Sequence, residues 1–194
     1  MRHNVEDLLK VIKDRRTIRP GDYSDKEVSK ADLETILSSA IWAPSHAETE
    51  PWRFKVYRGD KKAELGEFLK NLYLTKTPED KQDPVVVGRI TGGAAKASAV
   101  IAVTMKRQET EEIPEIEEIE AVACAVQNMH LTCTALGLAA LWGTPRLIYL
   151  EEMNDFLGID KKDKCLGLFY VGHPAKEWPE GNRKPVEEVT EWFD

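Results

Sequence analysis

The chain has 194 residues, of which 42% are hydrophobic and 31% charged, and its formal net charge is -7. A chain of this length can bury a sizeable core, and this composition excludes the disordered and fibrous classes of protein. The acidic balance also argues against a nucleic-acid-binding protein, because that class is more often basic.

The first part of the chain predicts two helices, a strand and a third helix. Four apolar residues near the N-terminus follow helical spacing: Val5, Leu8, Leu9 and Ile12. This helix must end before Pro20, and Ser29 in an N-cap position predicts a second helix that Pro44 stops. Alternating residues over 52–57 predict a strand, and a helix follows the turn at Gly59-Asp60.

The rest of the chain mixes helices and strands without regular alternation. Residues 75–96 predict a polar, partly helical connection, and 97–105 predict a strand buried on both faces. The acidic stretch 109–120 is typical of a solvated loop and helix start, and a buried helix follows to residue 136. Shorter elements are predicted at 138–142 (strand), 151–157 (helix) and 165–171 (strand). This order favours an α+β fold, and since no linker interrupts it we expect a single domain over residues 1–194.

The three cysteines and the apolar runs limit the cellular setting. Cys124, Cys133 and Cys165 lie in apolar surroundings without paired spacing, so we expect small core residues rather than disulfides or a zinc site. No apolar run approaches the roughly 20 residues of a membrane span, and the N-terminus carries no apolar signal stretch. We therefore expect a cytoplasmic protein with neither a membrane nor a nucleic acid as partner.

An arginine cluster stands where the first helix must end, at Arg15, Arg16, Thr17 and Arg19. Guanidinium groups bind phosphate oxygens in bidentate fashion, and a threonine hydroxyl adds a donor. Arg183 in the C-terminal tail could bring a further charge to the same anion. Surface salt bridges with the abundant glutamates explain Arg15, Arg16 and Arg19 equally well, and a solvated basic spot explains Arg183, so the residues alone leave both interpretations open.

Two aromatic turns are candidates for holding a flat ligand. The first, between the second helix and the first strand, contains Trp42, Pro44, Ser45 and His46. Such a rigid loop can hold a ligand, or its tryptophans can fill the core. A lone histidine is more often a structural hydrogen-bonding residue than a catalyst. The second turn contains Trp142, Gly143 and Thr144, where glycine permits close approach of a planar ring; an ordinary strand-ending turn is the alternative.

Motifs for several other chemistries are absent from the sequence. It contains no GxGxxG or Walker A motif, no HExxH or paired-cysteine metal site and no GxSxG elbow. Anion-binding and ring-holding features without a nucleophile or metal site favour a cofactor that carries its own chemistry. We therefore assign no side chain as an essential acid or base, and no metal ligand.

Four motifs in their order resemble the FMN-dependent nitroreductase family, especially its short members. They are RRTIR at 15–19; APSH at 43–46 with EPWRF at 50–54; ALGL at 135–138 with WGTP at 142–145; and GLFYVGHP at 167–174 before the tail. The resemblance implies an α+β fold with a central mixed, mostly antiparallel sheet surrounded by helices. It also implies an intertwined homodimer with two FMN sites at the subunit interface.

The resemblance further implies roles for the candidate residues. Arg15 and Thr17 would contact the FMN phosphate and ribityl chain, and Arg16 the ribityl chain or the polar edge of the ring. Arg183 would be the C-terminal contact to the phosphate. Two groups would enclose the isoalloxazine: Pro44, Ser45 and His46 from the partner chain, and Trp142, Gly143 and Thr144 on the other side.

The implied activity is a two-step, ping-pong oxidoreductase reaction. NAD(P)H would pass hydride to flavin N5 and leave, and a nitroaromatic, quinone or similar flat acceptor would then enter the same cleft. Two alternatives stay open at this point. One is a specialised reaction in the same family, such as dehalogenation, flavin fragmentation or metabolite dehydrogenation. The other is a flavin-binding protein without enzymatic activity.

Overall fold

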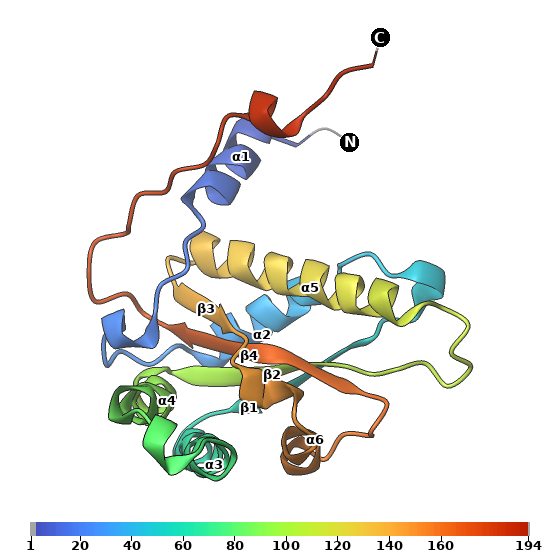
Figure 1. The fold of residues 1–194 in the computed structure, drawn as a ribbon. Coiled ribbons are helices and arrows are strands. Elements are labelled where there is room, and N and C mark those ends of the chain that lie inside the picture. Colours follow the sequence, from blue (N-terminus) through green and yellow to red (C-terminus); the bar gives the residue numbers. More distant parts are fainter. Residues whose placement is uncertain (1–2, 194) are drawn as a thin grey trace.

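A four-stranded antiparallel sheet between two layers of helices forms the body of the protein, as seen in a computed structural model that describes residues 3–193 (Figure 1). The strands β1 (Trp52–Tyr57), β2 (Ala99–Met105), β3 (Ala139–Gly143) and β4 (Lys164–Gly172) pair in the order β1-β2-β4-β3. One face of the sheet carries α2 (Lys30–Ala40) and α5 (Glu115–Ala135); the other carries α3 (Asp60–Lys76), α4 (Pro84–Lys96) and α6 (Glu151–Leu157). The α+β prediction is confirmed, with every pairing among these strands antiparallel rather than mixed.

Strand β2 explains why helices cover both faces of the sheet. All seven of its residues are buried. Ile101 and Val103 point into the core beneath α2 and α5, whereas Val100 and Ala102 point into the core beneath α3 and α6. Successive side chains of a strand point to opposite faces, so a continuous apolar run needs cover on both sides. The prediction of a doubly buried strand is confirmed.

Local capping sets the helix boundaries that the sequence indicates. The Ser29 hydroxyl accepts a hydrogen bond from the Asp32 backbone N–H at 3.0 Å and donates to the Asp32 carboxylate at 2.7 Å. Asp83 caps α4 by accepting from the Val85 N–H at 2.8 Å. Residues 75–96 are therefore more regular than predicted, since α3 extends to Lys76 and α4 fills the second half. No helix within residues 3–193 is long and apolar enough to cross a bilayer.

The cysteines divide between core and surface. Cys133 and Cys165 are buried as predicted, and burial raises the pKa of the Cys165 thiol to about 11. The prediction is wrong for Cys124, which is exposed although its neighbours Val122 and Ala125 are buried. It lies on the face of α5 that turns away from the sheet, so an apolar neighbourhood in sequence did not translate into burial.

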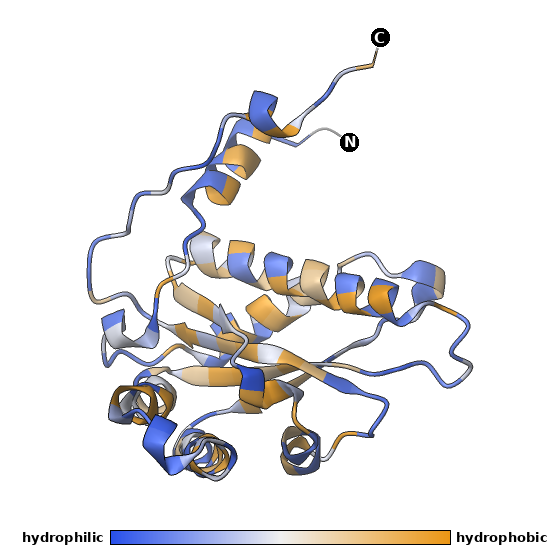
Figure 2. Cartoon of the chain, viewed as in Figure 1, coloured by the Kyte–Doolittle hydropathy of each residue, from blue (hydrophilic) through white to orange (hydrophobic). Residues whose placement is uncertain are grey.

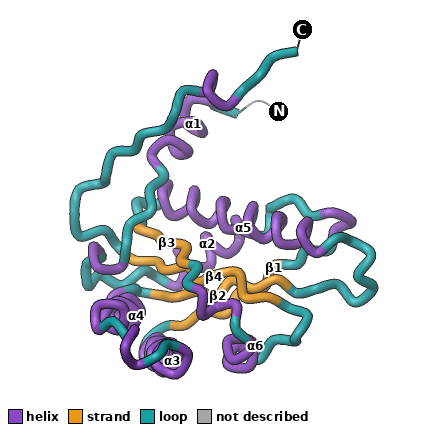
Figure 3. The backbone as a smooth tube through the Cα atoms, viewed as in Figure 1, coloured by secondary structure: helices purple, strands orange, loops and turns teal. Residues whose placement is uncertain are grey.

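The N-terminal helix and the C-terminal tail stand away from this body. Helix α1 (Val5–Asp14) buries none of its residues, and its apolar stripe, visible in Figure 2, is exposed at Val5 (61%) and Leu8 (54%). The tail is mostly loop and returns beside α1 (Figure 3), where the Trp178 indole donates to the Asp14 carbonyl at 2.6 Å. Beyond that contact Trp192 is 83% exposed. Both segments thus present apolar side chains that the described chain leaves uncovered.

Candidate functional site

The arginine cluster lies at the C-terminal end of α1, with Arg15 as the C-cap residue. Burial, followed by the positive charges of Arg183 and Arg16, lowers the pKa of the Arg15 guanidinium. The tail therefore brings Arg183 close to two arginines that stand far from it in the sequence. Like charges gathered around the half-buried Arg15 create a positive potential that an anion would relieve.

These guanidiniums are not neutralised by the surrounding protein. Within residues 3–193, Arg107 is the only arginine that lies within ion-pair distance of a carboxylate. Arg16 donates to backbone carbonyls instead: from Nη1 to Lys13 at 2.6 Å and from Nε to Pro179 at 3.1 Å. The tail backbone passes directly over the guanidinium at Gly181, where a Cβ would lie 2.0 Å from the Arg16 Cζ. Salt bridges with glutamates therefore do not account for the cluster in this part of the chain.

Thr17 and Arg19 face a cavity of ≈ 330 Å³ next to this cluster. Its other lining includes Pro179, the residue whose carbonyl binds Arg16, so the cavity continues from the arginine cluster. The Ile18 N–H donates to the Ala140 carbonyl at 3.0 Å, which anchors the segment to β3. The structure thus brings Arg15, Arg16, Thr17, Arg19 and Arg183 into one region.

A buried histidine lies within electrostatic range of Arg15. His130 on α5 is 6% exposed and meets the Phe169 ring edge-on, with ring centroids 4.7 Å apart. Burial, together with the Arg15 charge, lowers the pKa of His130 to about 4. Its imidazole is therefore neutral at pH 7 and adds no positive charge to the arginine cluster.

We expect His130 to make the protein less stable as the pH falls from about 6.5 toward 4. The unfolded chain takes up a proton on this residue near pH 6.5, whereas the folded protein resists it until about pH 4. The free energy of unfolding therefore keeps its full value at pH well above 6.5. It should be about 2 kcal/mol lower at pH 4.5 than at pH 7. Urea unfolding at pH 7 and pH 4.5 measures it, and His130→Gln should reduce the loss; equal losses in both proteins would contradict the assignment.

The two tryptophans at the ends of the loop between α2 and β1 lie in different environments. Trp52 is 5% exposed and fills the core, whereas Trp42 is 83% exposed. Trp42 and Ser45 line a second cavity, of ≈ 370 Å³, together with Ile41, Ala43, Glu48, Glu50 and Trp52. The core-filling interpretation therefore holds for Trp52, and Trp42 remains available for a ligand or a second chain.

The backbone of this loop is held in an uncommon conformation. Ala47, Glu48 and Glu50 have positive φ values of 49°, 54° and 43°. Non-glycine residues in this region cost on the order of 1–3 kcal/mol each and persist where the surroundings over-determine them. The Ser45 hydroxyl accepts from the Glu50 N–H at 3.3 Å, and the 3-10 turn His46–Glu48 is closed by the bond from the Thr49 N–H to the His46 carbonyl.

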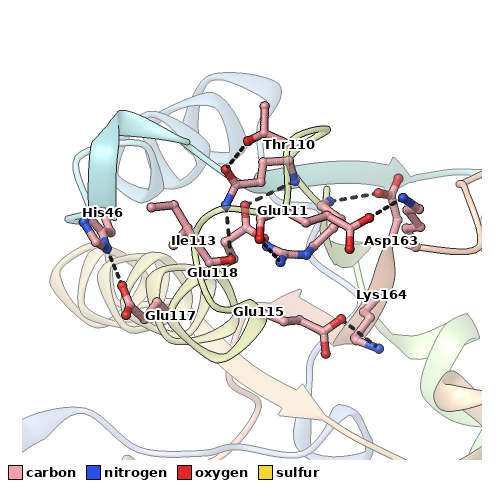
Figure 4. Close-up of polar contacts among 12 residues, drawn as sticks. His46, Thr110, Glu111, Ile113, Glu115, Glu117, Glu118, Asp163 and Lys164 are labelled. Carbon is pink, nitrogen blue, oxygen red and sulfur yellow. Dashed lines mark hydrogen bonds and ion pairs between the residues drawn. The ribbon is translucent and has the colours of Figure 1, made fainter.

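A hydrogen bond between a histidine and a carboxylate ties this loop to α5. His46 Nδ1 lies 2.5 Å from a carboxylate oxygen of Glu117, as Figure 4 shows. Sequence reasoning missed Glu117, because nothing in the local pattern relates residues 71 positions apart. The acidic stretch 109–120 is also more ordered than predicted: Glu118 is 1% exposed and pairs with Arg107, so it is not solvated.

The Trp142-Gly143-Thr144 turn ends β3. The Trp142 indole is half-buried and donates from Nε1 to the Leu166 carbonyl at 3.1 Å. It lies across Gly167, where a Cβ would come within 2.1 Å of the indole nitrogen. Thr144 is exposed. The Trp142 indole thus packs on its own chain, and its contact with a flavin ring stays a prediction.

The arginine cluster and the aromatic loop lie at different ends of α5. Arg15 lies close enough to His130 for its charge to lower the pKa of that histidine, whereas His46 contacts Glu117. At a rise of 1.5 Å per residue, positions 117 and 130 of this helix are about 20 Å apart. The two groups of candidate residues do not come together within one chain.

Comparison with known proteins gives one consistent result. The family model "Nitroreductase family" matches residues 12–173. A nitroreductase-like family protein from Bacillus cereus has 28% identity and a TM-score of 0.81, with 96% of each chain covered. A protein from Desulfovibrio desulfuricans, solved in complex with FMN, has 28% identity and a TM-score of 0.72 over 100% of each chain. A relative from Methanothermobacter thermautotrophicus, named NADH dehydrogenase/NAD(P)H nitroreductase, is 30% identical over 88% of this chain and 78% of its own.

Proposed function

Since the chain belongs to the nitroreductase family, we propose that it is an FMN-dependent oxidoreductase that passes hydride from NAD(P)H to nitroaromatic, quinone or similar flat acceptors. The observation that carries this proposal is the arginine cluster without carboxylate partners in the described chain. The FMN of the Desulfovibrio protein and the name of the Methanothermobacter relative support the choice of cofactor and electron donor.

The residues of the arginine cluster fit the phosphate of FMN. A phosphate offers several acceptor oxygens and a negative charge to guanidiniums that lie near one another without a carboxylate partner in the described chain. Arg15, Arg16 and Arg183 would hold it, and the Thr17 hydroxyl would add a donor. FMN, when bound, provides the hydride chemistry. The protein's contribution is to bind and orient the cofactor and to exclude water from it.

We further propose that the site is completed by a second copy of the chain, each copy forming a single domain over residues 1–194. The separation of about 20 Å along α5 supports a site in which one chain binds the phosphate and its partner contributes Pro44, Ser45 and His46. The exposed stripe of α1 and the exposed Trp192 give such a dimer apolar surface to bury.

One preparation of the purified protein tests these proposals together. It should be yellow, should bleach anaerobically on addition of NADPH or NADH, and should regain its colour when a quinone is added. Analytical ultracentrifugation should give a mass of twice the 22.0 kDa of one chain. Colourless protein that takes up no FMN would refute the cofactor assignment. Bound FMN that neither nicotinamide reduces would refute the proposed reaction and favour a specialised reaction of the same family.

A further inference from the structure

His46 is distinguished from the other histidines by its carboxylate partner. Within residues 3–193 it is the only histidine with a ring nitrogen within hydrogen-bond distance of a carboxylate, through Nδ1 and Glu117 at 2.5 Å. The His46 side chain is 60% exposed, and its Nε2 has no hydrogen-bond partner in this part of the chain. A carboxylate that binds one ring nitrogen orients the imidazole and leaves the other nitrogen free to exchange a proton.

The turn of α5 that carries Glu117 is anchored by the neighbouring residue. Glu118 binds the Arg107 guanidinium and accepts from the Gln108 N–H at 3.3 Å. The backbone N–H of Arg107 in turn donates to the Asp163 carboxylate at 2.9 Å. These bonds anchor the first turns of α5, and the helix places Glu117 within reach of the loop, where its carboxylate meets His46 Nδ1. A side chain held in this way can orient a histidine without large motion.

We propose that His46, oriented by Glu117, donates the proton that accompanies hydride transfer to the acceptor. This inference rests on the proposed function, in which the His46 loop lines the flavin of the partner chain. A quinone that receives a hydride needs one proton to become a hydroquinone. The protonated imidazole gives up its Nε2 proton, the Nδ1 proton stays on the bond to Glu117, and solvent reprotonates the exposed ring.

The two half-reactions should depend on His46 differently. Hydride transfer from NAD(P)H to the cofactor consumes no proton from this side chain, because the nicotinamide leaves as a cation. Reduction of the acceptor does consume one. A proton donor therefore affects the second half-reaction selectively, whereas damage to the shape of the cleft affects both.

Stopped-flow measurement of each half-reaction in the holoenzyme tests the proposal. His46→Gln should slow the oxidation of reduced enzyme by a quinone about 100-fold, the lower end of general acid–base effects, and slow reduction by NAD(P)H far less, because only the first of these steps takes a proton from the ring. Glu117→Ala should slow the same step about 10-fold, because the ring loses its orientation. Glu115→Ala is the matched control: Glu115 lies in the same first turn of α5 and pairs with Lys164 at 3.3 Å, so both half-reactions should stay at the wild-type rate.

A spectroscopic measurement separates this role from activity. In the purified holoenzyme, nitrogen-15 NMR of the neutral His46 ring should find the proton on Nδ1, and Glu117→Ala should move it to Nε2 while Glu115→Ala should not. Equal slowing of both half-reactions in His46→Gln, an unchanged oxidation rate, or an unchanged tautomer in Glu117→Ala would overturn the inference. Wild-type protein that binds no FMN would instead overturn the proposed function.

Discussion

Replacing Arg15 with alanine should weaken FMN binding by about 2–3 kcal/mol, which is roughly a 30- to 150-fold increase in Kd. The guanidinium is half-buried, close to Arg16 and Arg183, and has no carboxylate partner in the described chain. Its removal would leave a phosphate with fewer charge-assisted bonds. Titration of FMN into cofactor-free protein, followed by quenching of flavin fluorescence, measures the change.

A matched variant shows whether the effect belongs to this position. Arg89 is exposed on α4, on the opposite side of the sheet, and forms no ion pair with the described residues. Arg89→Ala removes the same charge and should leave the Kd for FMN unchanged. Equal affinity in wild type and Arg15→Ala would show that the phosphate binds elsewhere, and equal losses in both variants would reduce the effect to net charge.

Replacing Arg107 with methionine should lower the free energy of unfolding by about 3–5 kcal/mol. The Arg107 and Glu118 side chains are only 9% and 1% exposed, so the change leaves a carboxylate buried without its partner. The Gln108 N–H would still donate to Glu118, but one backbone donor does not balance a buried charge. Urea denaturation monitored by circular dichroism measures the loss.

The double variant Arg107→Met/Glu118→Leu provides the decisive comparison. It removes both charges and should be more stable than Arg107→Met alone, because no unpaired carboxylate remains. Lys162→Ala, which breaks the exposed pair with Glu111 nearby, should leave stability nearly unchanged. If Arg107→Met were as stable as Lys162→Ala, the buried pair of Arg107 and Glu118 would contribute little to holding the first turns of α5 in place.

Much of the fold could be predicted because its signals are local. The boundaries of β1 and the Ser29 cap depend on residues within a few positions of one another, and both predictions are confirmed. The wrong predictions concern burial. Cys124 and Glu118 are three turns or fewer from the start of the same helix, yet one is exposed and the other buried, contrary to their polarity. Which face of α5 meets the sheet is decided by packing, and not by side-chain type alone.

The candidate site divides in the same way. From the sequence alone it was possible to identify the kinds of side chain that suit a phosphate and a flat ring, in an order that resembles one family. The tertiary structure decided that the tail brings Arg183 to Arg15, that Glu117 pairs with His46, and that these two groups lie at different ends of α5. Periodicity and capping act over a few residues, whereas such contacts join positions distant in the chain, so they exist only after the helices and the sheet have packed.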